Sequence, residues 1–322
     1  MKRTTNRLII KRRRKKLIKR IITFSILILI VGTFVAIKTN LKLSKLESLL
    51  ATNIIDSKSK SDIIPTDDTS SDNSNPNKDE NSSNTVPTDP FEGLTLINDN
   101  RGVPVLCYHS IGDDPTGKNP IIISKEKLRQ DLQTIKNLGY TTLALSQLND
   151  YIFNDKAIPE KSVVITFDDG YKDNYTNAFP ILKELNLNAT IFVISSYLDG
   201  QTYLSPEEVK EMSDYGIDIQ SHTVNHVRLT DLSYAEQLKE LKDSKDQLEK
   251  LTGKPVNSIA YPEGFYNDDT KKAFSDSGYS MGFTIKRGYA DRDDKSFELN
   301  RICIDYTYKP TDIENVLKNL PK

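Results

Sequence analysis

The chain has 322 residues and a formal net charge of −1, which allows one large domain or two small ones. The charge is uneven: residues 1–20 contain eleven Lys or Arg and no acid, so residues 21–322 carry about −12. This acidic main part argues against nucleic acid or anionic lipid as its partner.

An uncharged apolar run, Ile21–Ile37, follows the basic block. Its seventeen residues just reach the ~17–25 that span a hydrocarbon core, and the basic flank favours a cytoplasmic N-terminus. We therefore expect a cytoplasmic segment at 1–20, a single-pass anchor in the cell membrane at 21–37, and an extracytoplasmic remainder. The alternatives are a cleaved signal peptide, a buried helix of a soluble domain, or a basic block that binds nucleic acid.

Residues 38–93 are expected to be an extracytoplasmic linker. From about residue 52 to residue 90 the chain is rich in Ser, Asn, Asp and Pro and has little to bury, which is typical of a disordered spacer. A globular pattern begins at about residue 94, so one folded domain is expected over 94–322.

Short β-branched runs alternate with helical patterns in this domain. Two helices are expected at 125–139 and 233–253, each closed by a glycine. The order of strands and helices predicts an α/β fold with a parallel sheet, either a (β/α) barrel or a doubly wound open sheet. The expected strands are 103–109, 140–145, 162–169, 189–194, 216–222, 258–262, 281–285 and 299–304.

Polar residues end four of these strands, at the edge where α/β proteins build their sites. One strand delivers Asp168 and Asp169, followed by Gly170. Two adjacent carboxylates repel each other, and a metal on one with the other left as a base relieves the repulsion. An ordinary Asp-Gly turn is the alternative.

The chain has only three histidines, and two of them, His222 and His226, lie four residues apart. On one helical turn both imidazoles would face the same way, and a His₂-carboxylate set suits Zn²⁺ or a related divalent ion. The third, His109, ends the first strand, where a structural role and a catalytic role are both open.

The motifs TFDDG at 166–170 and SHTVNH at 221–226 resemble those of the polysaccharide deacetylases of carbohydrate esterase family 4, the NodB homology domain. YHSIG at 108–112 and AYPEGFY at 260–266 resemble its circularly permuted poly-N-acetylglucosamine branch. The resemblance covers about residues 103–305. It implies a distorted (β/α)₇ barrel, within the seven or eight strand–helix units that the pattern predicts, and makes 94–322 the catalytic domain.

The resemblance also implies a role for each motif residue. Asp168 would be the general base and His109 the general acid, and Tyr261 would offer its backbone N–H to an oxyanion. The divalent metal, Zn²⁺ with Co²⁺ or Ni²⁺ as alternatives, would be held by Asp169, His222 and His226.

Two departures from the commoner family pattern matter. No Arg precedes the Tyr-Pro of the third motif, and no His follows His226, so His109 takes the place of the late acid. Arg301, on the last strand, is a candidate partner of Asp168, with a surface or structural arginine as the alternative. If the barrel closes, Cys107 and Cys303 lie on neighbouring strands; we expect two reduced thiols rather than a disulfide.

The expected function is therefore removal of N-acetyl groups from N-acetylglucosamine in an acetylated cell-surface glycan by a membrane-tethered monomer. The glycan would be peptidoglycan, a β-1,6-linked exopolysaccharide or a chitin-like oligomer. An O-acetyl esterase acting on a xylan-like glycan and an inactive wall-binding protein are the alternatives. The chain contains no GxSxG, P-loop or dinucleotide-binding motif, which disfavours serine hydrolase and nucleotide-dependent activities.

Overall fold

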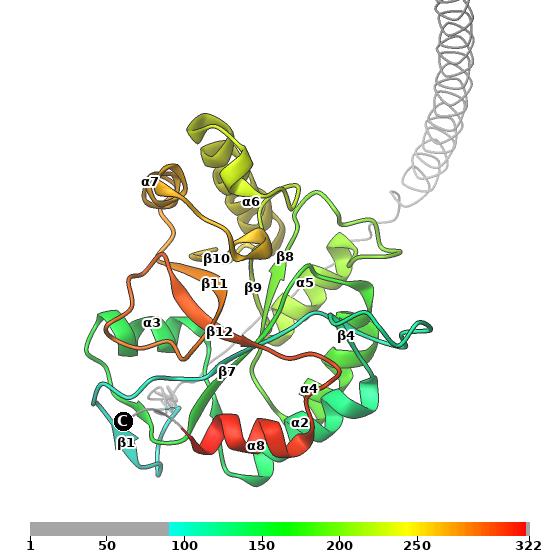
Figure 1. Ribbon diagram of the computed structural model, residues 1–322, viewed down its shortest axis with the longest axis vertical. Coiled ribbons are helices and arrows are strands. Elements are labelled where there is room, and N and C mark those ends of the chain that lie inside the picture. Colours follow the sequence, from blue (N-terminus) through cyan, green and yellow to red (C-terminus); the bar gives the residue numbers. More distant parts are fainter. Residues whose placement is uncertain (1–89, 320–322) are drawn as a thin grey trace, which may run out of the picture. The chain divides into compact units, whose positions relative to one another are not determined.

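The structure is a computed structural model that describes residues 90–319 (Figure 1). The basic segment expected at 1–20, the anchor at 21–37 and nearly all of the linker at 38–93 lie outside these residues. None of the helices in the described part of the chain has the length and apolar character of a membrane span.

Seven parallel strands close into a ring that follows the order of the chain. The ring closes where Val105 of the first strand pairs with Val164 of the next, and this closure confirms the predicted (β/α)₇ barrel over the doubly wound sheet. Its strands, in spatial order, are β2 (Val105–Tyr108), β12 (Leu299–Cys303), β11 (Met281–Arg287), β10 (Ser258–Ala260), β9 (Asp218–Ser221), β8 (Thr190–Val193) and β7 (Ser162–Phe167).

The strand expected at 140–145 is not part of this ring. Only β5 (Thr141–Thr142) is extended there, and it pairs with the first residues of β7. The helix α3 (Leu145–Phe153) follows at once, because Leu145, Leu148 and Ile152 recur at helical spacing and are buried. Two further short pairs are β1 (Leu96–Ile97) with β6 (Ile158–Pro159), and β3 (Ser110–Ile111) with β4 (Ile122–Ile123).

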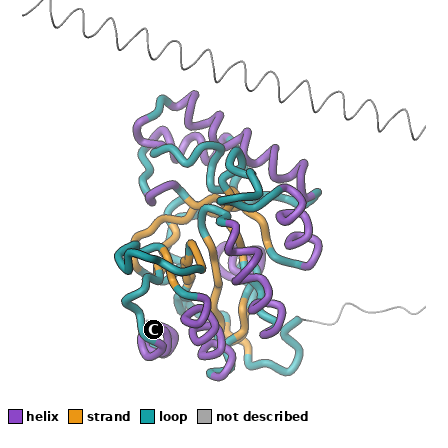
Figure 2. Tube along the Cα trace, turned by 90° about the vertical axis from the view of Figure 1, so that its right-hand side faces the viewer, coloured by secondary structure: helices purple, strands orange, loops and turns teal. Residues whose placement is uncertain are grey.

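Helices surround the strands (Figures 1 and 2). The predicted helices at 125–139 and 233–253 are confirmed within two residues at each end; Gly139 and Gly253, which follow them, adopt φ of 75° and 72°. The helices outside the ring are α2 (Lys125–Asn137), α4 (Phe179–Leu185) with the π-helical turn η1 (Asn174–Ala178) before it, α5 (Pro206–Tyr215), α6 (Tyr234–Thr252), α7 (Asp268–Asp276) and α8 (Pro310–Lys318); two short 3₁₀ turns are η2 (Leu229–Asp231) and η3 (Pro262–Gly264).

Alternate residues of each strand face opposite sides, and this separates two cores. On β7, Ile165 belongs to the large core under the helices, whereas Val164 packs in a second cluster with Phe192 and Phe283. Arg301 of β12 has its guanidinium over these two rings, 5.5 Å and 6.0 Å from their centroids. The inner face of the barrel therefore carries a buried charge, directly below the strand ends.

Candidate active site

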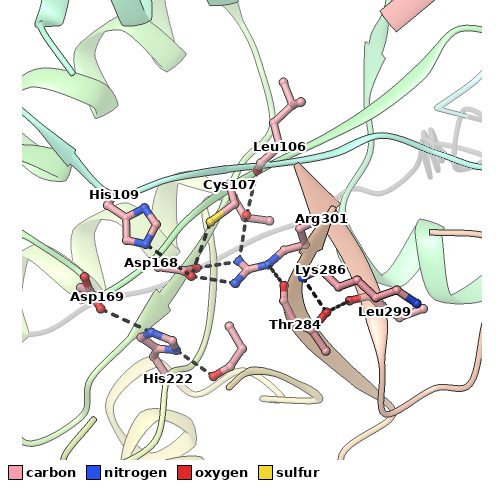
Figure 3. A network of polar contacts seen from close by, with 12 residues as sticks. Leu106, Cys107, His109, Asp168, Asp169, His222, Thr284, Lys286, Leu299 and Arg301 are labelled. Carbon is pink, nitrogen blue, oxygen red and sulfur yellow. Dashed lines mark hydrogen bonds and ion pairs between the residues drawn. The ribbon is translucent and has the colours of Figure 1, made fainter. Parts of the chain in front are cut away.

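The carboxyl ends of four strands bring the predicted site residues to one rim of the barrel. His109 follows β2, Asp168 and Asp169 follow β7, His222 follows β9, and Tyr261 follows β10. Parallel strands of a closed barrel all end on the same side, so residues more than 100 positions apart, such as His109 and His222, become neighbours. Figure 3 shows four of them, His109, Asp168, Asp169 and His222, close together around the strand ends.

Asp168 is held by a bidentate ion pair with Arg301 (Figure 3). Both guanidinium nitrogens lie 2.7 Å from the carboxylate oxygens, and Nε donates to the carbonyl of Thr284 at 2.9 Å. Burial opposes the charge on Asp168, but Arg301 outweighs it and lowers the pKa of this carboxyl far below its usual range. Arg301 is 0% exposed, so the surface alternative is wrong and the predicted contact with Asp168 is present.

Asp169 faces the two histidines of the second motif. Its Oδ1 lies 3.3 Å from Nε2 of His222 and 3.3 Å from Nε2 of His226, and the three candidate ligand atoms are all within 4.8 Å of one another. Oδ1 is buried and has no hydrogen-bond partner among the described residues. A buried carboxylate oxygen is costly without a partner, and a cation shared with the two nitrogens would supply one.

The hydrogen bonding of His222 supports the same interpretation. Its Nδ1 lies 2.7 Å from the carbonyl of Ala260, which can only accept, so Nδ1 carries the proton. In the neutral imidazole this leaves a lone pair on Nε2, the atom that faces Asp169. Burial lowers the pKa of His222, yet the side-chain contact with Asp169, followed by the charges of Asp168 and Asp169, outweighs burial and the pKa is raised. The donor set therefore fits a divalent metal.

The helical turn expected for His222 and His226 is wrong. The two residues lie on a loop after β9, with Thr223 at φ 66° and His226 at φ 52°, in the left-handed region. The carboxylate of Glu240 on α6 holds this loop open by accepting from the backbone N–H groups of Val224 and Asn225, at 3.0 Å and 2.9 Å. Asp169 also has a positive φ, 73°. Such strain in non-glycine residues is typical of functional sites.

His109 lies on the other side of Asp168. Its Nε2 is 3.9 Å from Asp168 Oδ2, and its side chain is 18% exposed. Burial is the main effect on His109 and lowers its pKa, although the neighbouring carboxylates oppose the shift. His109 is therefore a partly accessible, mostly neutral imidazole within reach of the Asp168 carboxylate.

Tyr261 does not lie as its predicted role requires. Its backbone N–H donates to the carbonyl of Phe283 at 3.0 Å, continuing the pairing of β10 with β11. An N–H that is already paired in the sheet cannot also bind an oxyanion, which argues against this role. Its ring is buried and packs against Tyr266, with centroids 5.8 Å apart.

The two cysteines are neighbours, as the closed barrel requires. Cys107 pairs in register with Cys303 on the adjacent parallel strand, and both are free thiols. Cys107 Sγ lies 3.5 Å from Asp168 Oδ2, a contact that the motifs did not predict. Strand alternation was the available signal, because Cys107 lies two residues before His109 and thus on the same face of β2. A hydrogen bond that the Cys107 thiol donates to Cys303, followed by burial, raises the pKa of Cys107.

Comparison with known proteins agrees with this geometry. The family model described as polysaccharide deacetylase matches residues 155–282. The Bacillus subtilis protein YxkH is 38% identical over 202 residues, covering 63% of this chain and 71% of the relative. The poly-β-1,6-N-acetyl-D-glucosamine N-deacetylase of Staphylococcus epidermidis is 30% identical over 196 residues, covering 56% of this chain and 68% of the relative. The solved Streptococcus pyogenes deacetylase PplD, in complex with acetate, superimposes with a TM-score of 0.66 at 33% identity over 68% of this chain and 100% of that one. The chain belongs to the polysaccharide deacetylase family.

Proposed function

We propose that the protein is a metal-dependent hydrolase that removes N-acetyl groups from N-acetylglucosamine residues of a cell-surface polysaccharide. One observation carries the proposal: the buried, unpartnered Oδ1 of Asp169 faces two imidazole nitrogens at 3.3 Å, directly beside a second carboxylate, Asp168. This arrangement combines a cation site with a separate base, the two elements that metal-assisted hydrolysis requires.

Asp169, His222 and His226 would hold the ion, for which Zn²⁺ is our first choice given two imidazoles and one carboxylate. When bound, such an ion polarises an acetyl carbonyl and lowers the pKa of a water molecule. The bond from His222 Nδ1 to the carbonyl of Ala260 fixes the ring, so that Nε2 keeps its direction whether or not the ion is bound.

Asp168 and His109 would move the proton. Asp168 is ionised at all physiological pH values because of Arg301, so it can accept a proton from the attacking water. His109 Nε2 lies 3.9 Å from Asp168 Oδ2, beyond direct hydrogen-bond distance, so one bridging water would carry the proton from the carboxylate to the imidazole. From there it would reach the amine nitrogen as it leaves, which an amide requires because an amine anion is a very poor leaving group.

The relatives support an N-acetylglucosamine polymer as substrate. The Staphylococcus epidermidis relative is named for N-deacetylation of poly-β-1,6-N-acetyl-D-glucosamine, and the structure of PplD holds acetate, the product expected from this reaction. We take the β-1,6-linked polymer as the first substrate to test and peptidoglycan as the second.

We also propose that residues 21–37 anchor the protein in the cell membrane, with residues 1–20 in the cytoplasm. The basic block and the apolar run of seventeen residues support this orientation. Release of the full-length chain from membranes by carbonate at high pH would contradict an integral anchor, and a truncated mature chain would indicate a cleaved signal.

The decisive experiment measures acetate released by the metal-loaded full chain from poly-β-1,6-N-acetylglucosamine, peptidoglycan and acetylated xylan in parallel, with metal analysis of the same sample. We expect release from at least one of the two N-acetylated polymers and loss of that release in Asp168→Asn. Release from xylan alone would indicate an O-acetyl esterase. No release from any glycan by protein that contains metal would refute the proposal.

A further inference from the structure

Three tyrosines lie together beside the metal-binding residues, and we call Tyr171, Tyr197 and Tyr203 the tyrosine wall. The rings of Tyr171 and Tyr203 are stacked, with centroids 5.2 Å apart and planes at 17°. Tyr197 meets Tyr203 edge-on, with centroids 5.0 Å apart and planes at 60°. The three rings therefore form one continuous aromatic group.

One end of the wall is tied to Asp169. Tyr171 follows Asp169 by two residues and forms an antiparallel bridge with Tyr203. On either side of this bridge, Lys172 N–H donates to the carbonyl of Thr202, and Leu204 N–H donates to that of Gly170, both at 2.9 Å. The position of this ring pair is thus set by the same turn that sets the carboxylate.

The other end is tied to the loop that carries His222 and His226. Ser195 and Ser196 donate their N–H groups to Thr223 and Val224 of that loop, each at 3.1 Å. The hydroxyl of Tyr197 donates to the carbonyl of Asn225 at 3.3 Å, one residue before His226. Hydrogen bonds therefore connect the wall to the segments that carry all three proposed metal ligands.

The wall is open to solvent. Tyr197 is 37% exposed, and Tyr171 and Tyr203 are half-buried. The hydroxyls of Tyr171 and Tyr203 can each donate and accept a hydrogen bond. Half-exposed aromatic rings that carry hydroxyl donors match a ligand with an apolar C–H face and polar edges, which is the chemistry of a pyranose ring.

We propose that the tyrosine wall binds the pyranose unit adjoining the one that loses its acetyl group, and so selects a polymer over a free sugar. This inference rests on the proposed function, because the wall flanks the site at which the acetyl group would react. A polymer gains this contact at every position along the chain, whereas a small acetate ester does not reach it.

The test compares the full chain with Tyr197→Ala and Tyr197→Phe, using a β-1,6-linked pentamer of N-acetylglucosamine and a fluorogenic aryl acetate. Loss of the ring should raise KM for the pentamer about tenfold and should change hydrolysis of the aryl acetate, which does not reach the wall, by much less. Tyr197→Phe keeps the ring and should remain within about twofold of the parent. Tyr215→Ala is the matched control: Tyr215 is 52% exposed but precedes β9, at the opposite end of the barrel strands.

An unchanged KM for the pentamer in Tyr197→Ala would overturn the inference. An equal rise in KM for the aryl acetate would also overturn it. If the parent protein releases no acetate from the pentamer, the β-1,6-linked polymer is ruled out as its substrate, and the wall is tested by calorimetric titration with the same pentamer. An about tenfold weaker Kd in Tyr197→Ala would then still support the wall. Equal Kd values, or no binding to either protein, would refute it.

Discussion

Replacing Arg301 with methionine removes the charge that faces Asp168 while keeping a long side chain between Phe192 and Phe283. In the parent protein Arg301 is 0% exposed and makes two 2.7 Å bonds to the carboxylate. The variant leaves Asp168, itself 2% exposed, without its charged partner. Removing one member of a buried ion pair typically costs about 3–5 kcal/mol of unfolding free energy.

The pH dependence gives the sharper readout. Arg301 lowers the folded pKa of Asp168, so the stabilisation that this pair provides is fully present above the unfolded pKa, about 3.9, and is lost as the pH falls through the folded value. In Arg301→Met, the charges of His222 and His109 still lower the folded pKa of Asp168, but burial is no longer opposed by Arg301 and should raise this pKa. The variant should therefore lose stability as the pH rises through that raised value, and its deficit against the parent should grow between pH 4 and pH 7.

Urea unfolding followed by circular dichroism at several pH values measures this deficit. The matched control is Arg129→Met, which removes an exposed arginine, 36% accessible, from its pair with Glu184 and should cost far less than Arg301→Met. The double variant Asp168→Asn with Arg301→Met should regain part of the lost unfolding free energy, because position 168 no longer carries a buried charge. A deficit in Arg301→Met below about 1 kcal/mol, constant with pH, would refute the reasoning.

Three further predictions follow from the site. Asp169→Ala should abolish tight Zn²⁺ binding in calorimetric titration, and full metal occupancy in this variant would contradict the ligand assignment. Glu240→Gln loosens the histidine loop and should weaken Zn²⁺ binding about 10–100-fold. His109→Ala should keep the metal and lose about 10²–10⁴-fold in acetate release from the glycan, so undiminished turnover would rule out its role as the acid. A thiol reagent should react with both Cys107 and Cys303 in denaturant and leave Cys107 unreacted in the folded protein. If neither thiol reacts in denaturant, the two cysteines form a disulfide.

The motif residues could be found from the sequence because they are close together along the chain. Asp168 and Asp169 are adjacent at the end of a buried strand, and His222 and His226 lie four residues apart in a chain with three histidines. Strand and helix order likewise predicted a parallel α/β sheet, and the family resemblance favoured the closed barrel over the open sheet. The helical turn was wrong because Glu240, from a different element, holds the histidine loop in left-handed backbone.

Long-range geometry is what the sequence left undecided. Arg301 lies 133 residues from Asp168, and only closure of the barrel brings β12 beside β2 and turns its inner face toward the carboxylate. The protonation of His222 depends on a carbonyl 38 residues away. Pairing of a backbone N–H, as at Tyr261, depends on which strand lies alongside. Residue type and short spacing thus determined which side chains can do the chemistry. The packing of strands distant in the chain decided where these side chains point, what they bind and which of them are charged.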